Sequence, residues 1–80
     1  MKARVHIFYK DSVFDPQGNT VGESLSKMGF SKVKKVRIGR VIDLEMEYPS
    51  KEEAKRDVVK MCEKLLANPV IETFTVRVEK

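Results

Sequence analysis

Residues 33–48 read VKKVRIGRVIDLEMEY, and this stretch decides the fold prediction. Apolar residues alternate with polar or charged ones on both sides of Gly39-Arg40, first over 36–38 and again over 42–48. Alternation of period two is typical of a β-strand, and a glycine between two such runs is typical of a hairpin turn. The stretch therefore predicts two antiparallel strands joined at Gly39-Arg40. A single glycine also fits a bulge in one long, bent strand.

A helix is predicted on the N-terminal side of this stretch. Asp15 and Pro16 mark its start, because an aspartate side chain accepts from free backbone N–H groups and proline suits the first helical position. Apolar residues then recur at helical spacing from Val21 to Met28. Gly29 follows where a left-handed C-cap residue is needed, so we expect the helix to end there.

A second helix is predicted on the C-terminal side. Ser50 and Glu53 have the spacing of a capping box, in which each side chain bonds to the other residue's backbone N–H. Apolar residues over 54–66 then form a stripe of helical spacing. Pro69 disfavours the helical conformation in the residue before it, so the helix should end by Ala67.

Two further alternating segments, at 2–9 and 73–78, predict a first and a last strand. The predicted order is therefore β-α-β-β-α-β. At this length the order indicates an α+β, ferredoxin-like sandwich, with a four-stranded antiparallel sheet and two helices on one face. The sequence has no linker and no short repeat, so residues 1–80 are predicted to form a single domain.

Composition restricts the class of protein. The 80 residues include 16 Lys and Arg against 12 Asp and Glu, a net charge of +4, and 41% are hydrophobic, which is too many for a disordered tail. A chain this small buries a modest core, so we expect self-association. A single cysteine excludes an internal disulfide, and no apolar run is long enough for a signal peptide or a membrane span. These features predict a soluble cytoplasmic protein.

Few residues have the context that catalysis requires. His6 is the only histidine and has no recognisable nucleophile partner, so it is read as an ordinary strand residue. Cys62 lies in the apolar stripe of the second helix and is read as a buried hydrophobe. The acidic residues are scattered, and no glycine-rich phosphate loop is present. We therefore predict no catalytic residue, no metal and no cofactor in this chain.

The predicted sheet has one face that the helices leave uncovered. Its residues mix charged, polar and aromatic groups, which suits contact with another protein. RNA-binding modules of this fold carry several aromatics there for base stacking, whereas here only Phe8 is available. The predicted residues of this face are Arg4, His6, Phe8, Arg37, Asp43, Glu45, Thr73, Thr75 and Arg77.

Three segments match the pattern of a known family. They are residues 15–18 (DPQG), 29–30 (GF) with 36–40 (VRIGR), and 61–72 (MCEKLLANPVIE). Together they resemble the PurS family, the small subunit of phosphoribosylformylglycinamidine (FGAM) synthase. The resemblance extends over nearly the whole chain.

The resemblance implies a role in the fourth step of purine synthesis. In that step formylglycinamide ribonucleotide, ATP and glutamine give FGAM, ADP, phosphate and glutamate. The family joins a PurL-type synthetase, which uses ATP with Mg, to a PurQ-type glutaminase and assists ammonia transfer between them. It is implied to work as a dimer or tetramer, to carry no catalytic residue and no cofactor, and to bind neither nucleic acid nor membrane.

Four exposed residues are candidate partner-docking positions, because the matches to the family concentrate in loops and helix ends, where binding residues tend to lie. The same motifs could instead have purely structural roles. Asp15 and Pro16 would start a helix, Gly18 would allow close packing, and Asn68-Pro69 would end a helix. A ligand-sensing module of the same fold and an RNA-binding domain remain as alternative functions. Salt-sensitive binding would indicate the RNA-binding domain. The candidate docking residues are Gln17, Arg37, Arg40 and Asn68.

Overall fold

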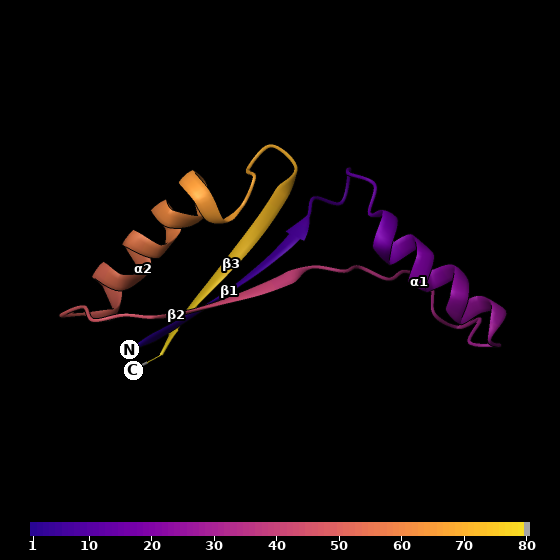
Figure 1. Ribbon diagram of the computed structural model, residues 1–80, viewed down its shortest axis with the longest axis horizontal. Helices are drawn as coiled ribbons and strands as arrows, with labels where there is room; N and C mark the ends of the chain where they lie inside the picture. The colour runs from indigo at the N-terminus through magenta and orange to yellow at the C-terminus, as the bar shows by residue number, and fades with distance from the viewer. Residues whose placement is uncertain (80) are drawn as a thin grey trace.

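The computed structural model describes residues 1–79, so Lys80 of the predicted domain lies outside the described residues. The elements follow the order β-α-β-α-β, with a short π-helical turn after the second helix (Figure 1). They are β1 (Lys2–Tyr9), α1 (Pro16–Lys27), β2 (Arg40–Glu45), α2 (Lys51–Met61), η1 (Cys62–Leu66) and β3 (Glu72–Glu79).

The sheet of the described residues has three strands in the order β2-β1-β3, and both neighbouring pairs are antiparallel. Ala3 in the central strand is opposite Leu44 on one side and Val78 on the other. The prediction of a four-stranded, ferredoxin-like sheet is therefore wrong. The first and last strands, at 2–9 and 73–78, were predicted correctly.

The missing strand is the first half of the predicted hairpin. Residues 33–39 form no strand and lead directly into β2 without a reversal. The backbone N–H of Ile38 donates to the Asp15 carboxylate at 2.9 Å, which ties this segment to the start of α1. Gly39 has no positive φ angle and lies against the Ile7 carbonyl, so it permits a close passage of the chain instead of making a turn.

The ends of α1 follow the predicted signals. The Asp15 side chain accepts from the N–H of Gly18 at 2.9 Å, and Pro16 occupies the first turn. Gly29 has a φ of 97°, in the left-handed region. The N–H of Phe30 donates to the Leu25 carbonyl at 2.9 Å, which completes a Schellman ending.

Helix α1 does not lie on the sheet. It has no substantial contact with the strands or with α2, and it projects away from them in Figure 1. The expectation of two helices on one face is wrong because the chain after α1 runs back beside that helix, where Val36 faces Gly22. The molecule is consequently elongated, with extents of 51 × 26 × 14 Å.

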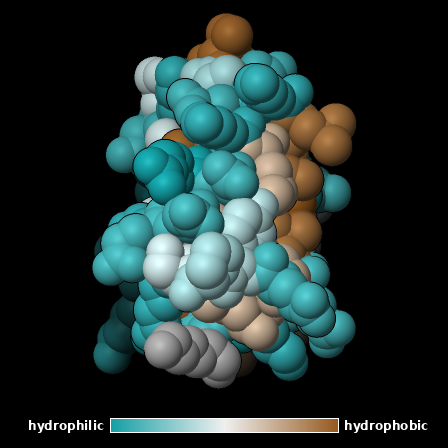
Figure 2. All heavy atoms as spheres, turned by 90° about the vertical axis from the view of Figure 1, so that its left-hand side faces the viewer, coloured by the Kyte–Doolittle hydropathy of each residue, from teal (hydrophilic) through white to brown (hydrophobic). Residues whose placement is uncertain are grey.

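Helix α2 provides the core. The Ser50 hydroxyl accepts from the N–H of Glu53 at 3.2 Å, which is one of the two bonds of the predicted capping box. The apolar side of the helix covers one face of the sheet, and the helical segment ends at Leu66, before Pro69. Viewed from the α2 end, the outer surface is mainly hydrophilic, with hydrophobic residues gathered along one side (Figure 2). The buried core residues are Ala3, Val5, Ile7, Ala54, Val58, Cys62 and Ala67.

Within residues 1–79, neither helix combines the length and the hydropathy that a membrane span needs.

Candidate partner-docking site

Asp15 connects two segments that are far apart in the sequence. One carboxylate oxygen accepts from the Gly18 N–H at 2.9 Å, and the other accepts from the Ile38 N–H at 2.9 Å. These bonds stabilise the charged form and lower the pKa of Asp15, and the bond from Ile38 has the larger effect on that pKa. The motifs at 15–18 and 36–40 therefore meet in one junction.

Two glycines allow the backbone to close at this junction. Gly18 faces the carbonyl oxygen of Val36, and a Cβ there would overlap it. Gly39 faces the carbonyl oxygen of Ile7, and a Cβ would also lie 2.6 Å from the Phe8 ring. Both glycines are thus required by close packing.

Arg37, a predicted docking residue, is part of the same junction. Its guanidinium lies over the Phe8 ring, 4.8 Å from the ring centre, and donates to the Tyr9 carbonyl at 3.1 Å. The Asp11 carboxylate is 4.0 Å away. Arg37 therefore anchors the β1–α1 loop, while part of its side chain stays exposed.

Arg40 and Asn68, two other predicted docking residues, meet through Glu72. Arg40 pairs with the Glu72 carboxylate at 2.7 Å and donates to the Leu66 carbonyl at 2.8 Å. The same carboxylate accepts from the Asn68 N–H at 2.7 Å. The Arg40 guanidinium, followed by the Asn68 N–H, lowers the pKa of Glu72, whose side chain is only 10% exposed.

The four predicted residues therefore fall into two groups. Gln17 and Arg37 belong to the α1 junction, and Arg40 and Asn68 belong to the corner where η1 leads into β3. Sequence reasoning identified Asp15 as a helix cap but missed its bond to Ile38, which spans 23 positions. It also missed Glu72 as the link between Arg40 and Asn68, although Glu72 ends the quoted motif 61–72.

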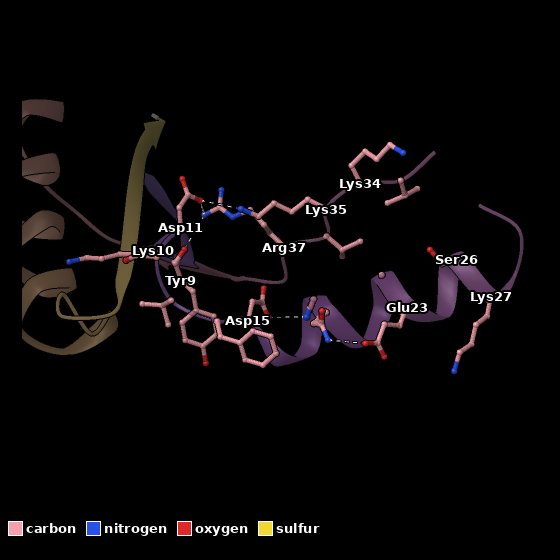
Figure 3. A pocket seen from close by; sticks show the side chains of 18 residues that line it. Tyr9, Lys10, Asp11, Asp15, Glu23, Ser26, Lys27, Lys34, Lys35 and Arg37 are labelled. Atoms are coloured by element: carbon pink, nitrogen blue, oxygen red, sulfur yellow. Dashed lines mark hydrogen bonds and ion pairs between the residues drawn. The ribbon is translucent and has the colours of Figure 1, made fainter. Parts of the chain in front are cut away.

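An open pocket of about 750 Å³ lies between α1, the β1–α1 loop and residues 33–37 (Figure 3). Its lining is mixed, with Phe14 and Val36 among charged side chains. Figure 3 shows Arg37 and Asp11 pointing toward each other, and Asp15 at the helix start. Over residues 1–79, no group of His, Cys, Asp or Glu could hold a metal ion. Mixed, open walls of this kind suit contact with a protein surface.

Comparison with known proteins assigns the chain to a family. The sequence profile of PurS, phosphoribosylformylglycinamidine (FGAM) synthase, matches residues 2–80. The chain belongs to the PurS family. It is 44% identical over 79 residues to the FGAM synthase subunit PurS of Methanocaldococcus jannaschii, covering 99% of this chain and 95% of that protein. It is 45% identical over 76 residues to PurS of Archaeoglobus fulgidus, with 95% of both chains covered.

Solved PurS structures agree with the fold. The crystal structure of the M. jannaschii PurS superposes with a TM-score of 0.89 and 44% identity, covering 99% of this chain and 95% of that one. A chain in the structure of PurLQS from Thermotoga maritima has a TM-score of 0.86 and 42% identity, covering 95% and 93%. The resemblance to PurS is thus confirmed, and the chain is a subunit of FGAM synthase in purine biosynthesis.

The Glu72 network gives this PurS an expected sensitivity to acid. The pKa of Glu72 lies below its ordinary value of 4.5 in the folded chain, so its contribution to stability is complete above that pH. That contribution is lost as the pH falls through the lowered value. We expect Glu72→Gln to lower the free energy of unfolding near neutral pH by about 1–2 kcal/mol and to flatten its decline below about pH 4.5.

Urea unfolding between about pH 7 and 3 measures this effect. Arg40→Gln should flatten the same part of the curve, because the guanidinium is the main cause of the lowered pKa of Glu72. Parallel curves for the wild-type chain and both variants would show that the network does not contribute.

Proposed function

We propose that the chain joins the synthetase and glutaminase subunits of FGAM synthase and assists ammonia transfer between them. The observation that carries the proposal is the match over nearly its full length to a chain in the PurLQS structure of T. maritima. In this proposal the synthetase partner uses ATP with Mg, and this chain holds no cofactor. Ammonia must pass between two active sites without escaping to water, so a subunit that positions them raises glutamine-dependent turnover without chemistry of its own.

The two nucleophile and base candidates of the chain support a non-catalytic role. Cys62 is fully buried between α2 and the sheet, and burial, with a smaller effect of Glu63, raises the pKa of its thiol. A protonated, enclosed thiol is a poor nucleophile. His6 lies on β1 opposite Val41 and Thr75, and within residues 1–79 no hydrogen bond or ion pair joins its ring to the Thr75 hydroxyl or to a carboxylate.

We also propose that the chain self-associates as a dimer or tetramer in the cytoplasm. Phe14, just before α1, and Val21, within it, are large exposed apolar residues, and this arm lacks the sheet contact that would cover them. The outer edges of β2 and β3 are unpaired within the described residues, so both could accept a further strand. Sedimentation of the isolated chain should give the mass of two or four copies. A sedimenting monomer at about 50 μM would contradict this part of the proposal.

Partner docking is proposed to involve Gln17, Arg37, Arg40 and Asn68. The double variant Arg37→Ala/Arg40→Ala is expected to weaken assembly with the other subunits at least about 30-fold, since arginines at interfaces often contribute more than about 1 kcal/mol each. A titration of labelled chain with the partner subunits measures this effect.

The docking test needs two controls. Arg37 and Arg40 both bond within the chain, so unfolding of the isolated variant must be measured alongside assembly. Arg56→Ala is a matched arginine control on α2, where the residue is exposed and lies outside the proposed docking positions. Unchanged assembly of the double variant, or equal weakening by Arg56→Ala, would remove both arginines from the docking surface.

The proposal as a whole predicts a complex that can be isolated. Gel filtration of the cognate synthetase and glutaminase with this chain should give one species that contains all three. Elution of the chain apart from both partners, with glutamine and nucleotide present, would contradict the joining role.

A further inference from the structure

Positive charge is concentrated in one segment of the chain. Residues 24–42 contain six of the 16 Lys and Arg residues and none of the 12 Asp and Glu residues. Within this segment Arg40 is paired with Glu72, and two other cations share the single Asp11 carboxylate. The remaining cations form no ion pair within residues 1–79: Lys27, Lys32 and Lys34.

These three lysines surround the turn at the far end of α1. The turn also exposes apolar side chains, with Met28 69%, Phe30 54% and Val33 43% exposed. We call residues 27–34 the basic tip. Figure 1 places this end of α1 opposite α2 and both termini along the long axis, so no other element of the described residues covers it.

An exposed apolar centre with a rim of cations has the anatomy of a protein interface. A nucleic acid would bind the lysines through its phosphates but would leave Met28 and Val33 without apolar contact. A second copy is disfavoured, because a two-fold interface through this patch would place its lysines against the same lysines. The positive charge of the three lysines therefore favours a partner protein whose contact surface is negatively charged.

We infer that the basic tip docks on an acidic patch with an apolar centre on a partner subunit of FGAM synthase. The inference rests on the proposed function, because the partner is one of the subunits that the chain joins. Charges at the rim of an interface mainly govern the association rate and its dependence on salt. The lysines of the tip should therefore matter most at low ionic strength.

The test compares two triple variants with the same change in charge. Lys27→Glu/Lys32→Glu/Lys34→Glu reverses the charge of the basic tip. A control variant reverses the charge of three lysines on the helical segment that covers the sheet. Acidic residues are interleaved with the control lysines, so that surface has no excess of one sign. The control variant is Lys51→Glu/Lys60→Glu/Lys64→Glu.

The readout is the affinity of each labelled chain for the cognate synthetase and glutaminase, separately and together. Reversing the tip should weaken binding at least about tenfold at 50 mM salt, and the difference should shrink to about twofold at 0.5 M. The control should stay within about twofold of the wild-type chain. A second tip variant with the three lysines changed to Gln should give an intermediate loss, and circular dichroism verifies that each variant is folded.

Equal binding by the tip variant and the wild-type chain would overturn the inference and leave the proposed function standing. A wild-type chain that binds neither subunit would overturn both. Labelled single-stranded RNA is the alternative probe. RNA binding tighter than subunit binding and lost on tip reversal would assign the basic tip to nucleic acid and overturn the inference.

Discussion

Gly39→Ala is expected to lower the free energy of unfolding by about 2–3 kcal/mol, because the added methyl group has no space. An ideal Cβ at this position overlaps the backbone carbonyl of Ile7 and lies 2.6 Å from the Phe8 ring. Neither neighbour is the end of a flexible chain, so the start of β2 would have to move away from β1. Urea unfolding of the variant measures the loss.

Gly29→Ala is the control for this substitution. A Cβ added at Gly29 would have no neighbour within 4 Å, and only the left-handed backbone, with φ of 97°, opposes a side chain there. Its loss should stay near 1 kcal/mol. A Gly39→Ala variant as stable as the wild-type chain would show that β2 does not pass so close to β1.

Two glycine-to-alanine substitutions in α1 are expected to change the free energy of unfolding in opposite directions. Replacing a helical glycine with alanine normally stabilises a chain by about 0.5–1 kcal/mol. Gly22→Ala should follow this rule, because its Cβ would lie 3.7 Å from the Val36 methyl group, an ordinary contact. Gly18→Ala should instead destabilise by about 1–3 kcal/mol, because its Cβ would overlap the Val36 carbonyl and lie 2.7 Å from the Asp15 carboxylate.

The pair tests the position of α1 directly. Thermal unfolding should place Gly18→Ala below and Gly22→Ala above the wild-type chain, by several degrees each for a domain of this size. Stabilisation by both alanines would mean that residues 33–38 do not lie beside α1. In that case the helix would be free to cover the sheet, as the order of elements in the sequence suggests.

Local signals in the sequence predicted the helices well. Asp15, Gly29 and Ser50 act through neighbours within a few positions, so their capping roles are visible in the sequence and are confirmed. The number of strands was predicted wrongly because apolar and polar residues alternate over 36–48 in the same way for a hairpin and for a single extended segment. The choice between them depends on bonds such as that from Ile38 to Asp15, 23 positions away.

The functional surface was predictable only in part. Arg37, Arg40 and Asn68 were singled out from their places in motifs, and the structure shows that each makes an intrachain bond. Glu72 is the residue that connects two of them, and no local pattern marks a carboxylate as the acceptor of a distant arginine. The family motifs at 15–18 and 36–40 meet in the junction, and the motif at 61–72 runs into the η1–β3 corner, where close contacts restrict their spacing. Residues 29–30 lie instead at the far end of α1.

The proposed role of this chain is to couple two active sites without catalysing a reaction itself. The most direct measurement is FGAM formation by the cognate synthetase and glutaminase, with and without the chain, using glutamine in one series and ammonium in the other. In the proposed role, glutamine-driven turnover requires the chain and ammonium-driven turnover largely does not. Equal turnover with and without the chain in both series would contradict it.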